Sequence, residues 1–336
     1  MNSKITINDV AQALGVSKTT VSRAISGKGR IGNETREKVL SYIEQHEYKP
    51  SAVAKSLAES KTYNIGFVVP GAMSLMDMPF FQKCMFSITE TASAFDYDVI
   101  ISSTDGEDLS HLERLVNNHK VDGIILARTT QQDPCIRYLK SKRIPFVTIG
   151  TTTEPDVIQV DNDHFNACKE LTSLLLLKGI TRLGLIGSDK SHVVTRLRYD
   201  GFVAGYEALQ MEPNYKEIFL DCNNMSSIER AVDEMLESDT QCIVCMDDYI
   251  CRYVLNKLHR EQVGIPQDIR VASFYDNVMQ ENDTATILPV TSIHFNIQEM
   301  AEAACRTLID AIEGRDYQYK RLFGYNIILS NSTQSN

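Results

Sequence analysis

The sequence lacks any apolar run long enough to cross a bilayer. Its longest, residues 171–177, is interrupted by Thr172 and Ser173, whereas a spanning helix needs about 20 apolar residues. The first residues, Met1-Asn2-Ser3-Lys4, lead directly into a polar segment and supply no apolar core for a secretion signal. We therefore expect a cytoplasmic protein that makes no membrane contact.

The sequence also lacks the short motifs of several enzyme classes. It contains no G-x-S-x-G elbow, no G-x-x-x-x-G-K-[ST] phosphate loop and no H-E-x-x-H zinc motif. Residues 27–32 satisfy G-x-G-x-x-G literally, but a dinucleotide fingerprint must follow a strand, and here a helical segment precedes it. A scattered His/Asp/Cys site stays open as an alternative that no pattern places. We expect a protein that is not an enzyme and uses no cofactor.

Cysteine is present, eight times, but in no arrangement typical of a metal site. Without a secretion signal, reduced thiols are expected. Cys242 and Cys245 have the spacing of a redox or metal pair, yet they belong to an apolar strand in which they would point to opposite faces. No second pair and no nearby histidine accompany them, so we expect no metal.

Charge is negative overall but unevenly distributed. The chain carries a net charge of −10, while residues 1–61 hold ten Lys/Arg against six Asp/Glu and so carry +4, which leaves −14 for the remainder. A basic amino-terminal end can contact phosphates, whereas an acidic body limits non-specific binding to nucleic acid. The asymmetry predicts a domain boundary near residue 60.

What is present begins with two short helices joined by a tight turn. Thr6 can cap the first helix, with Asp9 as the acid of a weak capping box, and Gly15 ends it. Ser17 can cap a second helix over residues 18–26. Two such helices form a helix-turn-helix, whose second helix enters the major groove of DNA.

The outer face of that second helix is rich in hydrogen-bond donors. With Val21 and Ile25 turned inward, Lys18, Thr19, Ser22 and Arg23 remain outside. Arginine pairs bidentately with guanine, while hydroxyls and lysine suit base edges or phosphates. Lys28 and Arg30, in the following loop, are predicted near phosphates. Taken helix by helix, the alternative of a merely solvated basic face is equally plausible.

A third helix is predicted to complete the bundle. It starts at Asn33 and Arg36, and its apolar residues Val39, Leu40 and Ile43 can close a small core against the first two helices. Such a bundle is large enough to form an independent module.

The order of these residues closely resembles the headpiece of the lac repressor family of bacterial transcription regulators. The resemblance is carried by residues 6–11, 15–17, 20–23 and 35–39, and it continues into residues 48–57, which resemble that family's hinge segment. It implies a homodimeric regulator whose two headpieces read the halves of a near-palindromic operator. The DNA-binding residues predicted in this way are Thr6, Ser17, Lys18, Thr19, Ser22, Arg23, Lys28, Arg30, Asn33, Ser51, Ala54, Lys55 and Leu57.

The hinge is predicted to fold when it binds. Pro50 ends the approach from the third helix, and Ser51 can cap a helix that runs to about Ala58. So short a helix is unstable alone because nucleation is costly, so DNA or a second copy must support it. By the resemblance, Leu57 wedges between base steps in the minor groove. The alternative is an ordinary linker side chain.

From Tyr63 onward, strands alternate with helices. Continuous apolar strands separated by helices imply parallel, doubly wound α/β sheets, here two lobes joined by crossings near residues 161 and 290. The domains are therefore predicted as residues 1–47 (headpiece), 48–61 (hinge) and 62–336 (two-lobed effector-binding and dimerisation domain). Strands are predicted at 64–70, 97–102, 122–127, 145–149, 183–186, 216–220, 241–246 and 269–274, and helices at 80–95, 109–118, 133–141, 164–178, 198–210, 226–237, 249–262 and 297–313.

Ligands of open parallel sheets bind beyond the carboxyl ends of the strands. This half resembles the family's effector domain, which is itself similar to periplasmic sugar-binding proteins. By that resemblance, Arg198, at a predicted helix start, clamps the ligand, Asp276 accepts from its hydroxyls, and Phe80 and Phe81 form an aromatic wall. Alternatives are an interlobe salt bridge for Arg198 and Asp276, and core packing for the two phenylalanines. The predicted effector-binding residues are Phe80, Phe81, Arg128, Arg198, Asp247, Asp276 and Phe295.

The chain departs from the family at several polar positions. Met246 and Phe295 stand where polar residues are usual, and Gly150-Thr151 replaces a frequent Asp-Arg. These changes argue against a simple monosaccharide, and residues 149–150 and 160–163 resemble the maltose-type members. The effector could be a sugar or a protein co-repressor, and the response induction or co-repression. The tail, residues 330–336, has no heptad pattern, which disfavours a coiled-coil tetramer.

Overall fold

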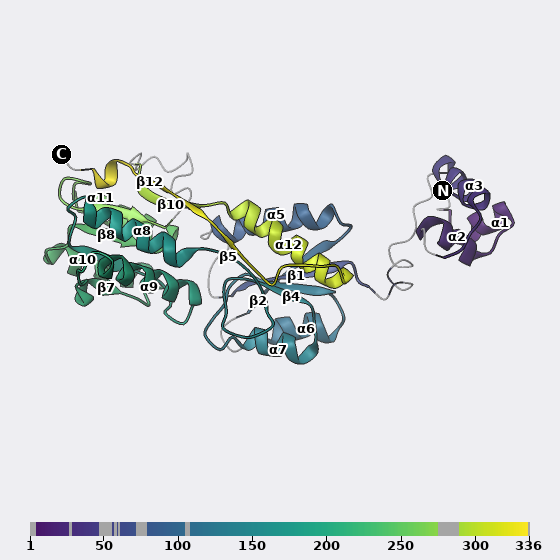
Figure 1. The fold of residues 1–336 in the computed structure, drawn as a ribbon, viewed down its shortest axis with the longest axis horizontal. Helices are drawn as coiled ribbons and strands as arrows, with labels where there is room; N and C mark the ends of the chain where they lie inside the picture. The colour runs from purple at the N-terminus through teal and green to yellow at the C-terminus, as the bar shows by residue number, and fades with distance from the viewer. Residues whose placement is uncertain are drawn as a thin grey trace. The chain divides into compact units, whose positions relative to one another are not determined.

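The computed structural model describes residues 5–26, 29–46, 56, 59, 61–71, 79–104, 108–274 and 289–334. It divides the chain into two compact units, Met1–Thr62 and Tyr63–Asn336, called the headpiece and the body here. The predicted hinge positions Ser51, Ala54, Lys55 and Leu57 lie outside the described residues. Figure 1 shows the three helices of the headpiece and the two sheets of the body.

The first headpiece helix begins and ends at its predicted capping residues, and the second begins at its predicted cap. The backbone N–H of Thr6 donates to Asp9 Oδ2 at 2.8 Å, and that of Asp9 donates to Thr6 Oγ1 at 3.4 Å, which completes a capping box. Gly15 ends the first helix with φ +64°, a backbone region that favours glycine. Ser17 Oγ accepts from the N–H of Thr20 at 3.1 Å. The helices are α1 (Ile7–Leu14), α2 (Lys18–Ser26) and α3 (Asn33–Gln45).

The headpiece core is small and apolar. Ile43 packs against it from α3, as predicted, and Val16 packs against it from the turn, but both remain partly exposed. The prediction for Leu40 was wrong, because its side chain is 44% exposed. A helix turns by about 100° per residue, so when Val39 occupies the buried face its neighbour points away. The buried residues are Val10, Ala11, Val21, Ala24 and Val39.

The first lobe of the body is built on a six-stranded parallel sheet. Its strand order is β11-β5-β4-β3-β1-β2, and every neighbouring pair is parallel. In Figure 1, α5 and α12 cover one face of this sheet and α6 and α7 the other. The strands are β1 (Asn64–Pro70), β2 (Asp98–Thr104), β3 (Gly123–Leu126), β4 (Phe146–Ile149), β5 (Ile158–Asn162) and β11 (Lys320–Phe323), and the helices α5 (Pro79–Ser93), α6 (Ser110–Asn117), α7 (Pro134–Lys142) and α12 (Ile297–Glu313).

The second lobe has a matching sheet with one antiparallel edge. Its order is β12-β10-β9-β8-β6-β7, and only the β10–β12 pair is antiparallel. Its strands are β6 (Leu183–Ile186), β7 (Ile218–Phe219), β8 (Cys242–Cys245), β9 (Arg270–Ser273), β10 (Thr291–Phe295) and β12 (Tyr325–Ile328), and its helices α8 (His164–Leu177), α9 (Val193–Glu207), α10 (Met225–Glu237) and α11 (Asp248–Arg260). Two 3₁₀ turns are Tyr215–Glu217 and Asn331–Thr333. The predicted doubly wound α/β architecture is confirmed.

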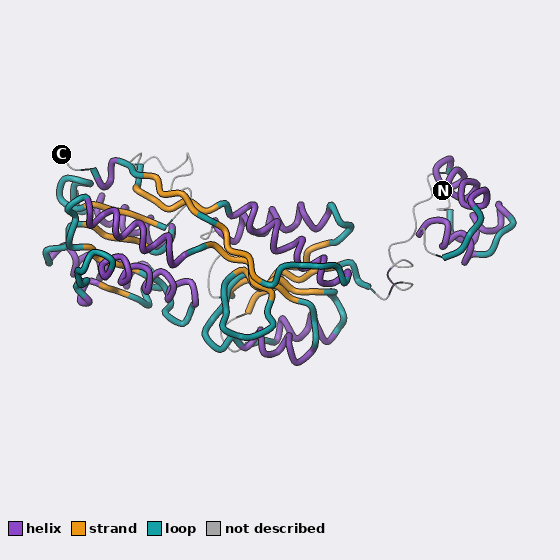
Figure 2. The backbone as a smooth tube through the Cα atoms, in the orientation of Figure 1, coloured by secondary structure: helices purple, strands orange, loops and turns teal. Residues whose placement is uncertain are grey.

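The chain passes between the lobes three times. It leaves the first sheet after β5, returns after β10 into α12, and crosses again at Gly324 between β11 and β12. Figure 2 shows these extended segments running from one lobe to the other. The third passage was not predicted. Each lobe therefore contains chain from both halves of the body sequence.

Several strands and one helix start differ from the prediction by more than one residue. The predicted crossing at 160–163 is largely strand β5, and β10, β11 and β12 were not predicted. Asp161 and Asn162 are polar, which is unusual for a buried strand, yet both side chains are buried. Helix α9 begins at Val193, so Arg198 lies within it instead of at its start. His192 caps that helix without a side-chain hydrogen bond, so the sequence carries no capping signal there.

The cysteine prediction is confirmed for the β8 pair. Cys242 packs in the cluster that also holds Val244, whereas Cys245 packs in a second cluster with Ile243. The two thiols therefore face opposite sides of the sheet. All eight cysteines are buried and free. Among the described residues, no helix has both the length and the apolar character needed to traverse a bilayer.

Candidate functional site

The headpiece exposes every predicted DNA-binding residue that the structure describes. Lys18, Thr19, Ser22 and Arg23 lie on the outer face of α2, opposite the buried Val21. Thr6, Ser17, Arg30 and Asn33 are exposed around it. The remaining predictions, Lys28, Ser51, Ala54, Lys55 and Leu57, lie outside the described residues.

Arg23 lies against the loop that follows its own helix. A Cβ placed on Gly29 would approach Arg23 Cδ and Nε at 3.2 Å, and Gly29 itself has φ +89°. Because Gly29 has no side chain, the side chain of Arg23 has room to pass over it. The loop limits the directions in which the guanidinium can point.

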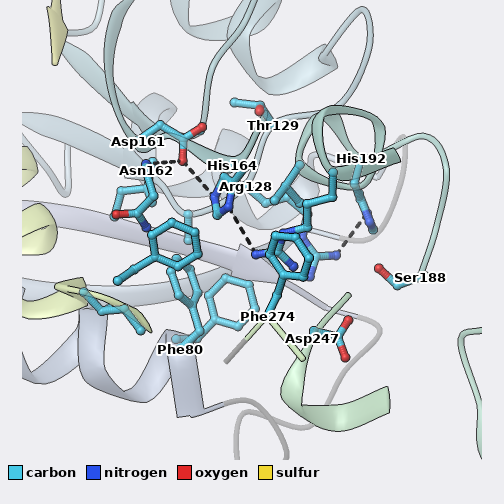
Figure 3. A pocket seen from close by; sticks show the side chains of 18 of the residues that line it. Phe80, Arg128, Thr129, Asp161, Asn162, His164, Ser188, His192, Asp247 and Phe274 are labelled. Carbon is cyan, nitrogen blue, oxygen red and sulfur yellow. Dashed lines mark hydrogen bonds and ion pairs between the residues drawn. The ribbon is translucent and has the colours of Figure 1, made fainter. Parts of the chain in front are cut away.

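In the body, the two lobes enclose a cavity of about 110 Å³ at the carboxyl ends of their strands. Side chains from both sheets and from α5, α8, α9 and α12 line it (Figure 3). Its wall consists of Phe80, Phe81, Ala127, Arg128, Thr129, Ile149, Gly150, Asp161, Asn162, His164, Ser188, His192, Val194, Arg198, Asp247, Asp248, Phe274, Phe295 and Ile297.

Aromatic rings form much of this wall. Phe80 and Phe81 meet edge to face, with ring centroids 5.2 Å apart. The guanidinium of Arg128 lies 5.4 Å from the Phe81 centroid. Phe295 meets the ring of His164 edge to face at 4.8 Å. Such rings offer flat apolar surfaces against which a ligand can stack.

Arg198 is held from several sides. Its Nη1 donates to the carbonyl oxygen of Met246 at the end of β8, and its Nη2 lies 3.3 Å from His164 Nδ1. Its guanidinium stacks 4.9 Å from the Phe274 centroid. Burial lowers the pKa of Arg198, but a guanidinium stays protonated in proteins. The Nε atom has no hydrogen-bond partner among the described residues.

Residues on the first crossing approach Arg198. His164 Nε2 lies 3.3 Å from Asp161 Oδ1, and Asp161 also accepts from the backbone N–H of Asn162 and of Thr151 (Figure 3). Burial is the largest cause that lowers the pKa of His164, followed by the Arg198 charge. The side-chain oxygen of Asn162 is buried and has no partner within the described ranges.

A second contact between the lobes lies beside the cavity. Thr130 and His192 form an antiparallel bridge, in which the Val193 N–H donates to the Thr129 oxygen and the Gln131 N–H to the Ser191 oxygen, both at 3.1 Å. Arg128 Nη1 lies 3.0 Å from His192 Nε2. Burial lowers the pKa of Arg128 to about 10 and that of His192 to about 4. His192 is therefore neutral at pH 7 and accepts from the arginine.

Two carboxyl groups stand at the start of α11. Asp247 caps the helix, where its Oδ1 accepts from the N–H of Ile250 at 2.8 Å. Burial raises the pKa of Asp247, and burial together with the Asp247 charge raises the pKa of Asp248 to about 7. At least one of the two can therefore hold a proton near neutral pH and donate it to a ligand oxygen.

The cavity contains all the predicted effector-binding residues that the structure describes: Phe80, Phe81, Arg128, Arg198, Asp247 and Phe295. Asp276 lies outside the described residues. Other residues that line the cavity were not among the predicted effector-binding residues: Asp161, Asn162, His164, His192, Asp248 and Phe274. Asp161 and Asn162 were interpreted as part of a crossing between the lobes, whereas their position at the carboxyl end of a buried strand could have identified them. Among the described residues, no group of three or more His, Cys, Asp or Glu is arranged to hold a metal ion.

Family models match both units of the chain. Residues 6–51 match the model described as bacterial regulatory proteins, lacI family. Residues 62–321 match the model described as periplasmic binding proteins and sugar binding domain of the LacI family. Together these matches include both the exposed face of α2 and the interlobe cavity.

Individual relatives span the same length. The transcriptional regulator MalR of Staphylococcus xylosus is 29% identical over 98% of both chains. The lac repressor dimer bound to operator and an anti-inducer has a TM-score of 0.79 at 19% identity, covering 99% of this chain and 100% of that one. The regulator CelR in complex with cellobiose has a TM-score of 0.72 at 23% identity, covering 98% and 99%. The two structures establish the fold alone.

From the two family matches and the fold that accompanies them, the chain belongs to the lac repressor family of bacterial regulatory proteins, DNA-binding transcription regulators with a helix-turn-helix headpiece and a two-lobed ligand-binding body.

Proposed function

We propose that this regulator is a repressor whose operator binding is controlled by a neutral sugar held between the lobes of the body. The observation that carries the proposal is the cavity at the carboxyl ends of both sheets, with aromatic walls and a few convergent polar groups. A ligand in this position touches both lobes at once, so its binding depends on their arrangement.

The chemistry of the cavity favours hydroxyl groups over anions. Arg198 Nε is an unpartnered donor and Asn162 Oδ1 an unpartnered buried acceptor in the described part of the chain. Leaving such a group unpaired costs about 1–3 kcal/mol. A hydroxyl can accept from the first and donate to the second. An anion could satisfy Arg198 or Arg128 but would also lie beside Asp161 and the two carboxyl groups at the start of α11.

A small molecule fits these observations better than a protein co-repressor. The unpartnered atoms are themselves buried and belong to residues that line the cavity, so the surface of a folded protein cannot reach them. We therefore assign the control of operator binding to a ligand in the cavity. A protein co-repressor would have to bind at another surface.

DNA recognition is assigned to the exposed face of α2 in a homodimer. Arg23 is positioned to read a guanine, Lys18, Thr19 and Ser22 to contact base edges or phosphates, and Arg30 and Asn33 to contact phosphates. The hinge predicted at residues 51–58 would complete the contact in the minor groove. Because the operators of a bacterial chromosome lie in the cytoplasm, we place this regulator there.

A thermal-shift screen of the full chain tests the ligand assignment. Glucose, maltose and cellobiose are compared with glucose 6-phosphate, because a ligand that binds the folded state raises the melting temperature by mass action. We expect at least one neutral sugar to raise it and the phosphate ester to have less effect. Stabilisation by the phosphate ester alone, or by none of the four, would contradict the proposed ligand class. Arg198→Leu serves as the control variant that removes the response.

A further inference from the structure

His164 connects the first crossing to the arginine of the ligand cavity. It is the first residue of α8, directly after the crossing from β5, and only 5% of its surface is exposed. One ring nitrogen contacts Asp161 on β5 and the other contacts Arg198 on α9. One imidazole thus joins a strand of the first lobe to a helix of the second.

The partners of His164 determine its tautomer. A guanidinium can only donate hydrogen bonds, so Arg198 Nη2, 3.3 Å from Nδ1, requires that nitrogen to be the acceptor. The proton of a neutral ring must then be on Nε2, where it faces Asp161 Oδ1 at 3.3 Å. A doubly protonated ring would place an N–H against the guanidinium. The charged groups facing His164, namely Asp161, Asp163 and Arg198, and its burial together leave its pKa below the ordinary value.

The chain of contacts leaves one nitrogen of Arg198 without a partner in the described part of the chain. Nη1 is committed to Met246 and Nη2 to His164, while Phe274 supports the guanidinium plane. Nε has no partner among the described residues. Holding the other two nitrogens fixes the direction of the Nε–H, which reduces the entropy lost when a ligand accepts from it.

We propose that His164 is a positioning residue for effector binding: as a neutral ring protonated on Nε2, it accepts from Arg198 and donates to Asp161, and so sets Arg198 for a ligand hydroxyl. Arg198 is thereby attached to the first crossing between the lobes. This inference rests on the proposed function for its ligand, but the state of His164 can be tested without one.

The first experiment uses the ligand-free full chain. Imidazole ¹⁵N spectra of histidine-labelled protein are recorded from pH 5 to 8, and the His164 signals are identified by their loss in His164→Gln. We expect the Nε2–H tautomer at pH 7 and, in Arg198→Leu, a higher His164 pKa, because a neighbouring cation has been removed. The Nδ1–H tautomer, or a titration that Arg198→Leu leaves unchanged, would overturn the proposal.

The second experiment uses maltose and cellobiose in calorimetric titrations at pH 7.5. His164→Phe keeps an aromatic ring beside Phe295 but can neither accept nor donate a hydrogen bond. It should raise the dissociation constant of the sugar by about tenfold or more. His164→Gln has one acceptor and one donor and should remain within about threefold of wild type. Melting curves verify that both variants fold. Equal affinity of the two variants would contradict the positioning role.

The two experiments separate the possible failures. If neither sugar binds the wild type while the tautomer is as expected, the proposed sugar is wrong and the assignment of His164 stands. If a sugar binds and the tautomer is not as expected, the ligand assignment stands and the inference about His164 fails.

Discussion

At the scale of single residues, the exposed donors of α2 differ in what they can read. Arg23 can form two parallel hydrogen bonds to guanine, whereas a lysine contacts a phosphate as a point charge. The side chain of Arg23 extends over Gly29, so its direction is limited. The sequence identified the residue, but its contact with Gly29 could not be predicted, because it depends on the path of the loop.

Replacing Arg23 by alanine should remove discrimination at one base pair in each half-site. The loss is expected to be about 1–3 kcal/mol for each half-site on the preferred sequence and smaller on random DNA. Fluorescence anisotropy with both duplexes at one salt concentration measures the difference. Lys18→Ala is the matched comparison on the same helix. An equal loss on both duplexes for Arg23→Ala would refute base reading by this residue.

Asp248→Asn should alter the pH dependence of stability in a defined direction. The pKa of Asp248 is about 7 in the folded chain against 3.8 for an ordinary aspartate, so the folded state binds more protons than the unfolded state between these values. Its contribution therefore makes the protein less stable as pH rises from about 4 to about 7. His192, with a pKa of about 4, acts in the opposite direction.

Melting temperatures of wild type and Asp248→Asn measure this contribution, because the effect of His192 is common to both. The variant should melt higher at pH 8, and the difference should vanish towards pH 4. A difference that does not change with pH would show that the carboxyl group of Asp248 is not shifted as described.

At the scale of elements, two glycines let α9 approach α8. A Cβ on Gly201 would meet the Phe165 oxygen at 2.4 Å and Cys168 Cβ at 2.8 Å, and one on Gly205 would meet Thr172 Cβ at 2.6 Å. The first of these contacts is with backbone, which cannot move aside cheaply. The close approach holds Arg198, on α9, next to His164 at the start of α8.

Gly201→Ala should therefore destabilise the body by about 1–3 kcal/mol, as overpacking does in other cores. Urea unfolding of the full chain measures the loss. Gly324→Ala is the matched control, because no atom lies within 4 Å of a Cβ placed there. Similar stability of both variants would show that α8 and α9 can separate without cost.

Most elements of the fold could be predicted from apolar periodicity, and β1, β6 and α12 were predicted with the correct bounds. The prediction failed for β5, whose last residues line the cavity. This strand ends in Asp161 and Asn162, and polar residues are not expected in a buried strand. The strands β10, β11 and β12 pair with segments far away in sequence, and no local pattern records such pairing. His164 was missed for the same reason, since its role depends on Arg198.

At the scale of the whole molecule, the basic segment and the ligand cavity lie in different parts of the chain. Residues 1–61 are basic, while the acidic remainder holds the cavity. Binding of a ligand can change operator affinity only as far as the ligand binds the two lobe arrangements unequally. The three passages between lobes and the Thr130–His192 bridge restrict how the lobes can move.

The most direct test is the operator affinity of the full chain with and without its sugar. A duplex selected from a random pool is titrated by fluorescence anisotropy, first alone and then with the neutral sugar that raises the melting temperature most. The account predicts that saturating sugar changes the operator affinity, and that Arg198→Leu binds the operator without responding to the sugar. An operator affinity that the bound sugar leaves unchanged would contradict it.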